Sequence, residues 1–156
     1  MARRKIGIWL IGAKGGVATS VTVGLVALRK GLAGGAGLVT QLPLCANLDL
    51  AQWPDFVLGG HEIRQTTLHE AALLLASNNH ALDSDLIAKC KPDLDKIDKN
   101  TRDGTLFNVG HRIEDFATDD LKKRAVKEIP RAAIERIQAL RHAVAEWRPR
   151  GWKTGP

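Results

Sequence analysis

The residues best placed to do chemistry form a glycine-rich turn, GAKGGVATS, over residues 12–20. The turn follows an apolar run at Lys5–Ile11 and precedes a stretch of helical periodicity. A helix N-terminus exposes unpaired backbone N–H groups and the positive end of the helix dipole, and both attract anions. Glycines at such a turn let a diphosphate approach the backbone without meeting a side chain. This context predicts a phosphate-binding loop.

The match to the dinucleotide fingerprint Gly-x-Gly-x-x-Gly is imperfect. Gly12 fits the first glycine, but Gly15 and Gly16 come with a spacing one residue longer than usual. Residues 32–41 contain no Asp or Glu that could bind the ribose. On the motif alone, dinucleotide binding and a tight turn whose glycines only permit close packing both remain open.

A second phosphate-binding interpretation is disfavoured. The segment KGGVATS, residues 14–20, is similar to the deviant phosphate loop of partition-type ATPases. Those loops continue with Gly, Lys and then Thr or Ser, whereas this chain has Ala18, Thr19 and Ser20. The lysine that contacts the phosphates is therefore missing, and no apolar strand ends in an Asp that would hold magnesium.

The other reactive side chains do not form a recognisable constellation. The five histidines at positions 61, 69, 80, 111 and 142 have no metal-ligand spacing with each other or with cysteine, so we expect no metal site. Cys45 and Cys90 make a poor disulfide framework. Cys90 falls on the apolar face of a predicted helix, which indicates a core residue rather than a nucleophile.

The elements that must position the loop follow from hydrophobic patterning. Lys5–Ile11 predicts a strand buried on both faces, and Leu38–Leu42 and Phe56–Leu58 predict two more. Between them, apolar residues at helical spacing predict one buried helix face, made of Val17, Val21, Leu25, Leu28 and Leu32. Strand, glycine turn, helix and strand form the first half of a βαβ unit.

The rest of the chain is predicted to be mainly helical. Apolar residues predict helices over 68–76 and 86–97, with Pro92 breaking or restarting the second. Residues 101–110 predict a turn and then a short strand or loop. Residues 118–147 predict a helix with a kink at Pro130 and an apolar stripe of Ile134, Ile137, Leu140, Val144 and Trp147. Residues 148–156, with two Pro and two Gly, predict a flexible tail.

Composition limits the class of protein. The chain has 156 residues, 44% apolar and 26% charged, as in one ordinary globular domain rather than a disordered chain. No apolar run is long enough to span a membrane, and we expect a cytoplasmic protein. Residues 111–156 hold 11 basic and 7 acidic residues, and their mixing favours a solvated helix face over a phosphate-binding patch. Because aromatic residues are also sparse, we expect no nucleic-acid partner.

Several separated blocks, in order, carry a family resemblance. They are KIGIWLIGAKGGVATSVTVGL, GLVTQLP, FVLGGHEIR, KPDLDKI and GTLFNVG, between about Lys5 and Gly110. Together they resemble the N-terminal segment of inositol-3-phosphate synthases (myo-inositol-1-phosphate synthases) of the prokaryotic form. The resemblance implies an α/β fold: a Rossmann-like, partial parallel sheet with flanking helices, in which residues 1–147 form the N-terminal part of an NAD-binding domain.

The resemblance also implies a cofactor, a reaction and a site. The family binds NAD and isomerises glucose 6-phosphate to 1D-myo-inositol 3-phosphate, with no net redox change. By this resemblance, the residues expected to wrap the NAD diphosphate are Gly12, Ala13, Lys14, Gly15, Gly16, Val17, Ala18 and Thr19. Glu62 falls where the family places an acid near the adenosine ribose, which favours NAD over NADP. A helix-start or surface carboxylate is the alternative for Glu62, and Arg64 is interpreted as a surface residue.

The chain also departs from the family pattern. It is much shorter than family members and lacks the Asn-x-Ala-Ser-Thr-Glu-Pro block, the catalytic lysines and the oligomerisation domain of the family, which commonly forms tetramers. We therefore expect a truncated synthase that is inactive alone, and we assign it no catalytic residue. We also expect an uncovered strand edge and an uncovered apolar helix face. A stand-alone, non-catalytic nucleotide-binding module is the alternative.

Overall fold

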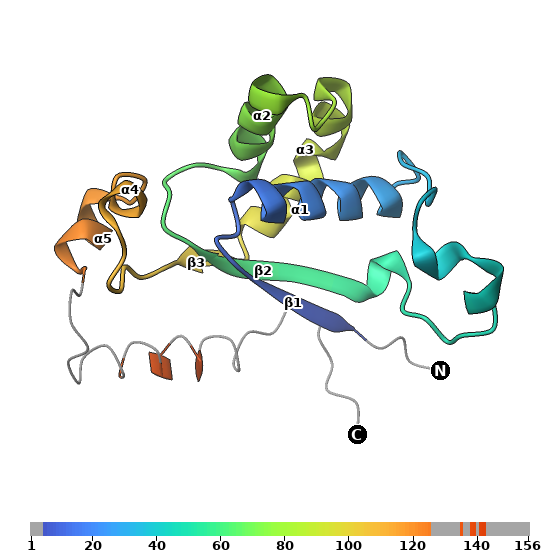
Figure 1. Ribbon diagram of the computed structural model, residues 1–156, viewed down its shortest axis with the longest axis horizontal. Helices are drawn as coiled ribbons and strands as arrows, with labels where there is room; N and C mark the ends of the chain where they lie inside the picture. The colour runs from blue at the N-terminus through green and yellow to red at the C-terminus, as the bar shows by residue number, and fades with distance from the viewer. Residues whose placement is uncertain (1–4, 126–134, 136–137, 140, 143–156) are drawn as a thin grey trace.

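The computed structural model describes residues 5–125, 135, 138, 139, 141 and 142 (Figure 1). Its centre is a parallel sheet in the order β1-β2-β3, made of β1 (Ile6–Ile11), β2 (Phe56–Glu62) and β3 (Thr101–Asp103). Helices α1 (Gly16–Arg29), α2 (Leu68–Asn79) and α3 (Ser84–Asp98) pack against one another on one side of the sheet, and α3 contacts β2. The predicted α/β class, a Rossmann-like parallel sheet with flanking helices, is confirmed.

Strand β1 lies at one edge of the described sheet. Its residues pair in register with β2, from Ile6 opposite Phe56 to Ile11 opposite His61. The prediction that β1 is buried on both faces is wrong, because Ile11 is 80% exposed. The cause is that the described helices lie on one side of the sheet, and β1 has only β2 as a described neighbour.

The second predicted strand, Leu38–Leu42, is also wrong. The segment forms a short 3-10 helix, Val39–Gln41, and a second one follows at Pro43–Cys45. Glycines precede the run, and Pro43 cannot donate to a sheet ladder. Local i→i+3 hydrogen bonds therefore form instead, such as the one from the Leu42 N–H to the Val39 carbonyl at 3.1 Å.

Strand β2 is confirmed, and it is longer than the predicted Phe56–Leu58. It continues through Gly59 and Gly60 to Glu62. A Cβ on Gly60 would lie 2.2 Å from the Leu10 carbonyl oxygen, so glycine permits the close approach of β1 and β2. The added residues bring the carboxyl end of β2 beside the glycine loop.

Helix α1 is confirmed, although it ends before the predicted Leu32, and its predicted buried face is wrong except at Leu25. Val17 is 82% exposed and Val21 is 46% exposed. The buried side chains are Thr19, Thr22, Val23, Leu25, Val26 and Ala27. Most of these are smaller than leucine, which allows α1 to pack closely on α2 and α3. The helix ends as predicted at a glycine, because Gly31 adopts a positive φ of 66°.

Helices α2 and α3 complete the core. Both begin at side-chain caps, where the Thr67 hydroxyl and the Asp83 carboxylate accept backbone N–H groups. Cys90 is fully buried in the cluster, as predicted. The predicted break at Pro92 is wrong, since α3 runs through it. The exposed Ala88 carbonyl, which loses its partner, can bind water, while Leu94 anchors the following turn in the core.

Beyond β3, the chain forms a loop and two short helices, α4 (His111–Glu114) and α5 (Asp119–Lys123), to one side of the sheet (Figure 1). The predicted solvated face is seen on α5, where two exposed aspartates, Asp119 and Asp120, precede two exposed lysines, Lys122 and Lys123. The Pro130 kink, the predicted stripe from Ile134 to Trp147 and the tail 148–156 lie outside the described residues. No helix among the described residues is long and apolar enough to cross a membrane.

Candidate functional site

The glycine loop is tied to the carboxyl end of β2. The backbone N–H groups of Gly12 and Ala13 both donate to the His61 carbonyl, at 2.9 and 3.0 Å. Gly12 has a positive φ of 77°, a conformation that glycine adopts without strain. The turn therefore starts from a fixed point at the end of the sheet where two parallel strands finish.

Glu62 holds the next part of the loop. Its Oε2 accepts the Lys14 backbone N–H at 2.6 Å, and its Oε1 accepts those of Ile63 and Arg64 at 2.8 and 3.1 Å. The residue is only 5% exposed, so the surface-carboxylate alternative is wrong. With four acceptor positions on a carboxylate, Oε2 keeps room for one further donor.

The side chain of Lys14 is engaged inside the protein. Its ammonium donates to the Thr66 carbonyl and forms an ion pair with Asp98, whose Oδ1 lies 3.1 Å from Nζ. The Lys14 side chain is 13% exposed and that of Asp98 is 18% exposed. The backbone of Lys14 belongs to the loop, while its ammonium links the segment after β2 to the end of α3.

The first turn of α1 presents free donors. Gly15 is the N-cap, and its carbonyl accepts the Thr19 N–H at 2.8 Å. No group in the described part of the chain accepts the N–H of Gly16, Val17 or Ala18, and the first turn contains no acidic residue. The buried hydroxyl of Thr19 also has no hydrogen-bond partner there. These unpaired donors suit an anion.

Arg64 reaches over the loop, whereas the sequence predicts a surface residue at this position. Its Nη1 donates to the Lys14 carbonyl at 3.4 Å, and its Nε lies 3.8 Å from Glu62 Oε1. Its guanidinium carbon lies 5.3 Å from the centre of the Phe116 ring. A Cβ on Gly15 would stand 3.8 Å from Nη2. The signal that could have found Arg64 is its place just after the end of β2, where the strand ends meet the loop.

Two cavities adjoin this arrangement. One of about 550 Å³ is lined by Gly16, Arg64, Leu74 and Phe116, among others. The other, of about 630 Å³, is lined by Glu62, Arg64 and the first residues of α5. Both volumes fall in the range of small-molecule sites. Of the predicted site residues, the structure thus brings Lys14, Gly16 and Glu62 to the cavity walls.

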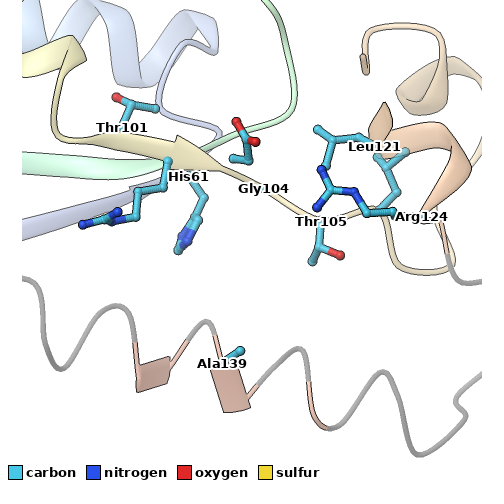
Figure 2. A pocket seen from close by; sticks show the side chains of 10 residues that line it. His61, Thr101, Gly104, Thr105, Leu121, Arg124 and Ala139 are labelled. Carbon is cyan, nitrogen blue, oxygen red and sulfur yellow. The ribbon is translucent and has the colours of Figure 1, made fainter. Parts of the chain in front are cut away.

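A third cavity, of about 510 Å³, lies at the other side of the carboxyl end of the sheet. Figure 2 shows His61 and Thr105 pointing toward Ala139. The Trp9 indole N–H donates to Nδ1 of His61 at 2.9 Å. Burial, and then the nearby Arg102, lower the pKa of His61, so the ring is neutral with its proton on Nε2. None of the predicted loop residues lines this cavity.

The described residues contain no cluster of three or more His, Cys, Asp or Glu side chains that could hold a metal ion. What they do provide is one anion-attracting turn, one buried carboxylate behind it and one arginine over it. This arrangement can hold a phosphorylated ligand by its backbone amides and a single cation.

Comparison with known proteins identifies a family. An NAD-binding family model described as myo-inositol-1-phosphate synthase matches residues 6–148 of the chain. This span contains the loop, the end of β2 and Arg64, and it confirms the resemblance found in the sequence blocks. No match was found among curated proteins.

Proposed function

Because the chain belongs to the myo-inositol-1-phosphate synthase family through its NAD-binding domain, we propose that it binds NAD at the loop between β1 and α1. The observation that carries the proposal is the free N-terminal turn of α1. Three successive amides, those of Gly16, Val17 and Ala18, have no acceptor in the described part of the chain. A diphosphate supplies the acceptors that these donors lack.

The loop residues 12–19 then act as a cradle for the diphosphate. Gly15 and Gly16 leave the backbone open to the phosphate oxygens. Glu62 acts on the cradle from behind, since it fixes the Lys14 amide. Its remaining acceptor position suits one ribose hydroxyl, and its charge repels a 2′-phosphate, which supports NAD over NADP.

The family converts glucose 6-phosphate to 1D-myo-inositol 3-phosphate, and we propose that this chain contributes the NAD-binding part of that reaction. Bound NAD supplies the hydride acceptor. The residues of this chain bind and orient the cofactor, and we assign none of them a proton-transfer role. An enolate would need a nearby cation. The Lys14 ammonium is committed to Thr66 and Asp98, and we assign Arg64 below to the diphosphate rather than to the sugar. We therefore propose that these 156 residues bind the cofactor without turning over the sugar.

Calorimetric titration of the purified chain tests the proposal. We expect saturable binding of NAD, weaker binding of NADP and no binding of ATP at the same concentration. Preferential binding of ATP would instead favour the partition-type interpretation. A parallel assay with NAD and glucose 6-phosphate should give no inositol phosphate, and its appearance would refute the non-catalytic part of the proposal.

A further inference from the structure

We infer that Arg64 binds the cofactor diphosphate from the side opposite the α1 amides. The inference rests on the proposed function and adds a residue to it. Arg64 lies two residues beyond Glu62, at the point where β2 ends against the glycine loop. Its Nη2 stands 3.8 Å from where a Cβ of Gly15 would be, so the guanidinium borders the N-cap of α1.

The contacts of Arg64 orient its guanidinium and leave donors unused. Nη1 donates to the Lys14 carbonyl, and Nε faces Glu62. The Phe116 ring supports the planar group at 5.3 Å. No group in the described part of the chain accepts a hydrogen bond from Nη2, and the side chain is 38% exposed. Arg64 is therefore held in place by an ion pair between its Nε and Glu62 Oε1, while Nη2 keeps its donors for a ligand.

Arg64 and the free amides open onto the same space. Gly16 and Arg64 both line the cavity of about 550 Å³, together with Leu74 and Phe116. Leu74 and Phe116 are 58% and 62% exposed, and they give the cavity an apolar wall beside its polar end. A nucleoside diphosphate has this composition: charged oxygens at one end and a flat base at the other. Asp115 is the carboxylate on the same wall, and its charge keeps the phosphates toward Gly16.

Among the cations near the loop, the geometry selects Arg64. Lys14 is closer in sequence, but its ammonium is bound to Thr66 and Asp98. A guanidinium can donate two parallel hydrogen bonds to phosphate oxygens, which also fixes the orientation of the phosphate. The diphosphate is thereby held between partial positive charges of the helix on one side and a full charge on the other.

The test compares Arg64→Gln with Arg102→Gln, a matched removal of an exposed arginine on β3 that does not line the loop cavities. NAD and ADP-ribose are titrated into each variant and into the unaltered chain, after circular dichroism has shown that all three are folded. We expect Arg64→Gln to weaken both ligands roughly tenfold to a hundredfold, the range for one charge-assisted hydrogen bond. Arg102→Gln should leave both affinities unchanged.

Salt dependence separates a direct contact from a structural effect. If Arg64 touches the diphosphate, the affinity of the unaltered chain for NAD falls with added salt more steeply than that of Arg64→Gln. Equal slopes, or unchanged NAD affinity in Arg64→Gln, would overturn the inference while leaving the proposed function standing. A selective loss of NADP binding would also overturn it, because it would place the guanidinium at the ribose. Failure of the unaltered chain to bind NAD would remove the proposed function itself.

Discussion

The backbone N–H of Lys14 donates to Oε2 of Glu62 across 2.6 Å, and this bond joins the glycine loop to the carboxyl end of β2. The two residues are 48 positions apart in the chain. The buried carboxylate thus fixes the middle of the loop, directly before the free amides of α1. In a Rossmann-like fold an acid at this point is expected to face the ribose. Here the same carboxylate also organises the backbone that would hold the phosphates.

Replacing Glu62 by Gln should destabilise the protein and loosen the loop. An amide offers one oxygen where the carboxylate offers two, so at least one part-buried N–H of Lys14, Ile63 or Arg64 loses its acceptor. We expect the free energy of unfolding to fall by about 1 to 3 kcal/mol. Urea denaturation measures it, and Asp95→Asn, at an exposed helix ion pair, is the control expected to change it by less than about 0.5 kcal/mol. Equal effects of the two changes would contradict this role of Glu62.

Two glycine-to-alanine changes should have opposite signs. In Gly60→Ala the new Cβ would meet the Leu10 carbonyl oxygen at 2.2 Å and the Ala13 Cβ at 2.8 Å, so β1 or the loop must shift. We expect a loss of about 2 kcal/mol or more, as in other overpacked sites. In Gly24→Ala, within α1, nothing lies within 4 Å, and helix propensity predicts a gain of about 0.5 to 1 kcal/mol. Thermal melting of both variants checks the prediction, and a tolerated Gly60→Ala would contradict the described strand packing.

The stability of the fold should fall as the pH drops below neutrality, in part through His61. Burial and the charge of Arg102 lower its pKa from the ordinary value of 6.5, so the unfolded chain takes up a proton first. The His61 contribution is therefore complete above about pH 6.5 and is lost as the pH falls through that value toward the folded pKa. We expect His61→Asn to flatten the pH dependence of the unfolding free energy between about pH 5 and 7, by at most about 1.4 kcal/mol per pH unit. His80→Asn, at an exposed position, should keep the original slope.

Removing the Lys14 charge should affect stability more than cofactor binding. Lys14→Met leaves the Asp98 carboxylate, which is 18% exposed, without its cation. We expect a loss of about 1 to 3 kcal/mol, against about 0.5 or less for Lys91→Met, whose exposed pair with Asp95 is solvated. Because the ammonium faces Thr66 and Asp98, the NAD affinity of folded Lys14→Met should stay within about threefold. A tenfold loss would show that the lysine reaches the cofactor.

The loop and its flanking elements could be predicted from sequence because their signals are local. An apolar run, a glycine cluster and a helical period follow one another between Lys5 and Lys30, and each depends on near neighbours. The buried face of α1 could not be predicted in this way. Small residues such as Thr22 and Ala27 are buried because α2 and α3 approach them, which depends on packing between distant segments.

The site itself depended on the same long-range geometry. Glu62 could be placed near the loop through its position in a family-like block, but its three amide donors could not be foreseen. Arg64 reads as an ordinary surface residue until the end of β2 is seen beside Gly15. The strand predicted at Leu38–Leu42 does not form, because the segment has the composition of a strand but is followed by Pro43, which cannot donate to a sheet ladder.

An NMR titration of the ¹⁵N-labelled chain with NAD, followed at the backbone amides, tests directly whether the first turn of α1 holds the cofactor. We expect saturable shifts at Gly15, Gly16, Val17 and Ala18, with matching changes at the Arg64 side chain. Two results would contradict NAD binding at the glycine loop. One is saturable binding with shifts confined to the third cavity, around His61 and Thr105, and the other is no binding at all.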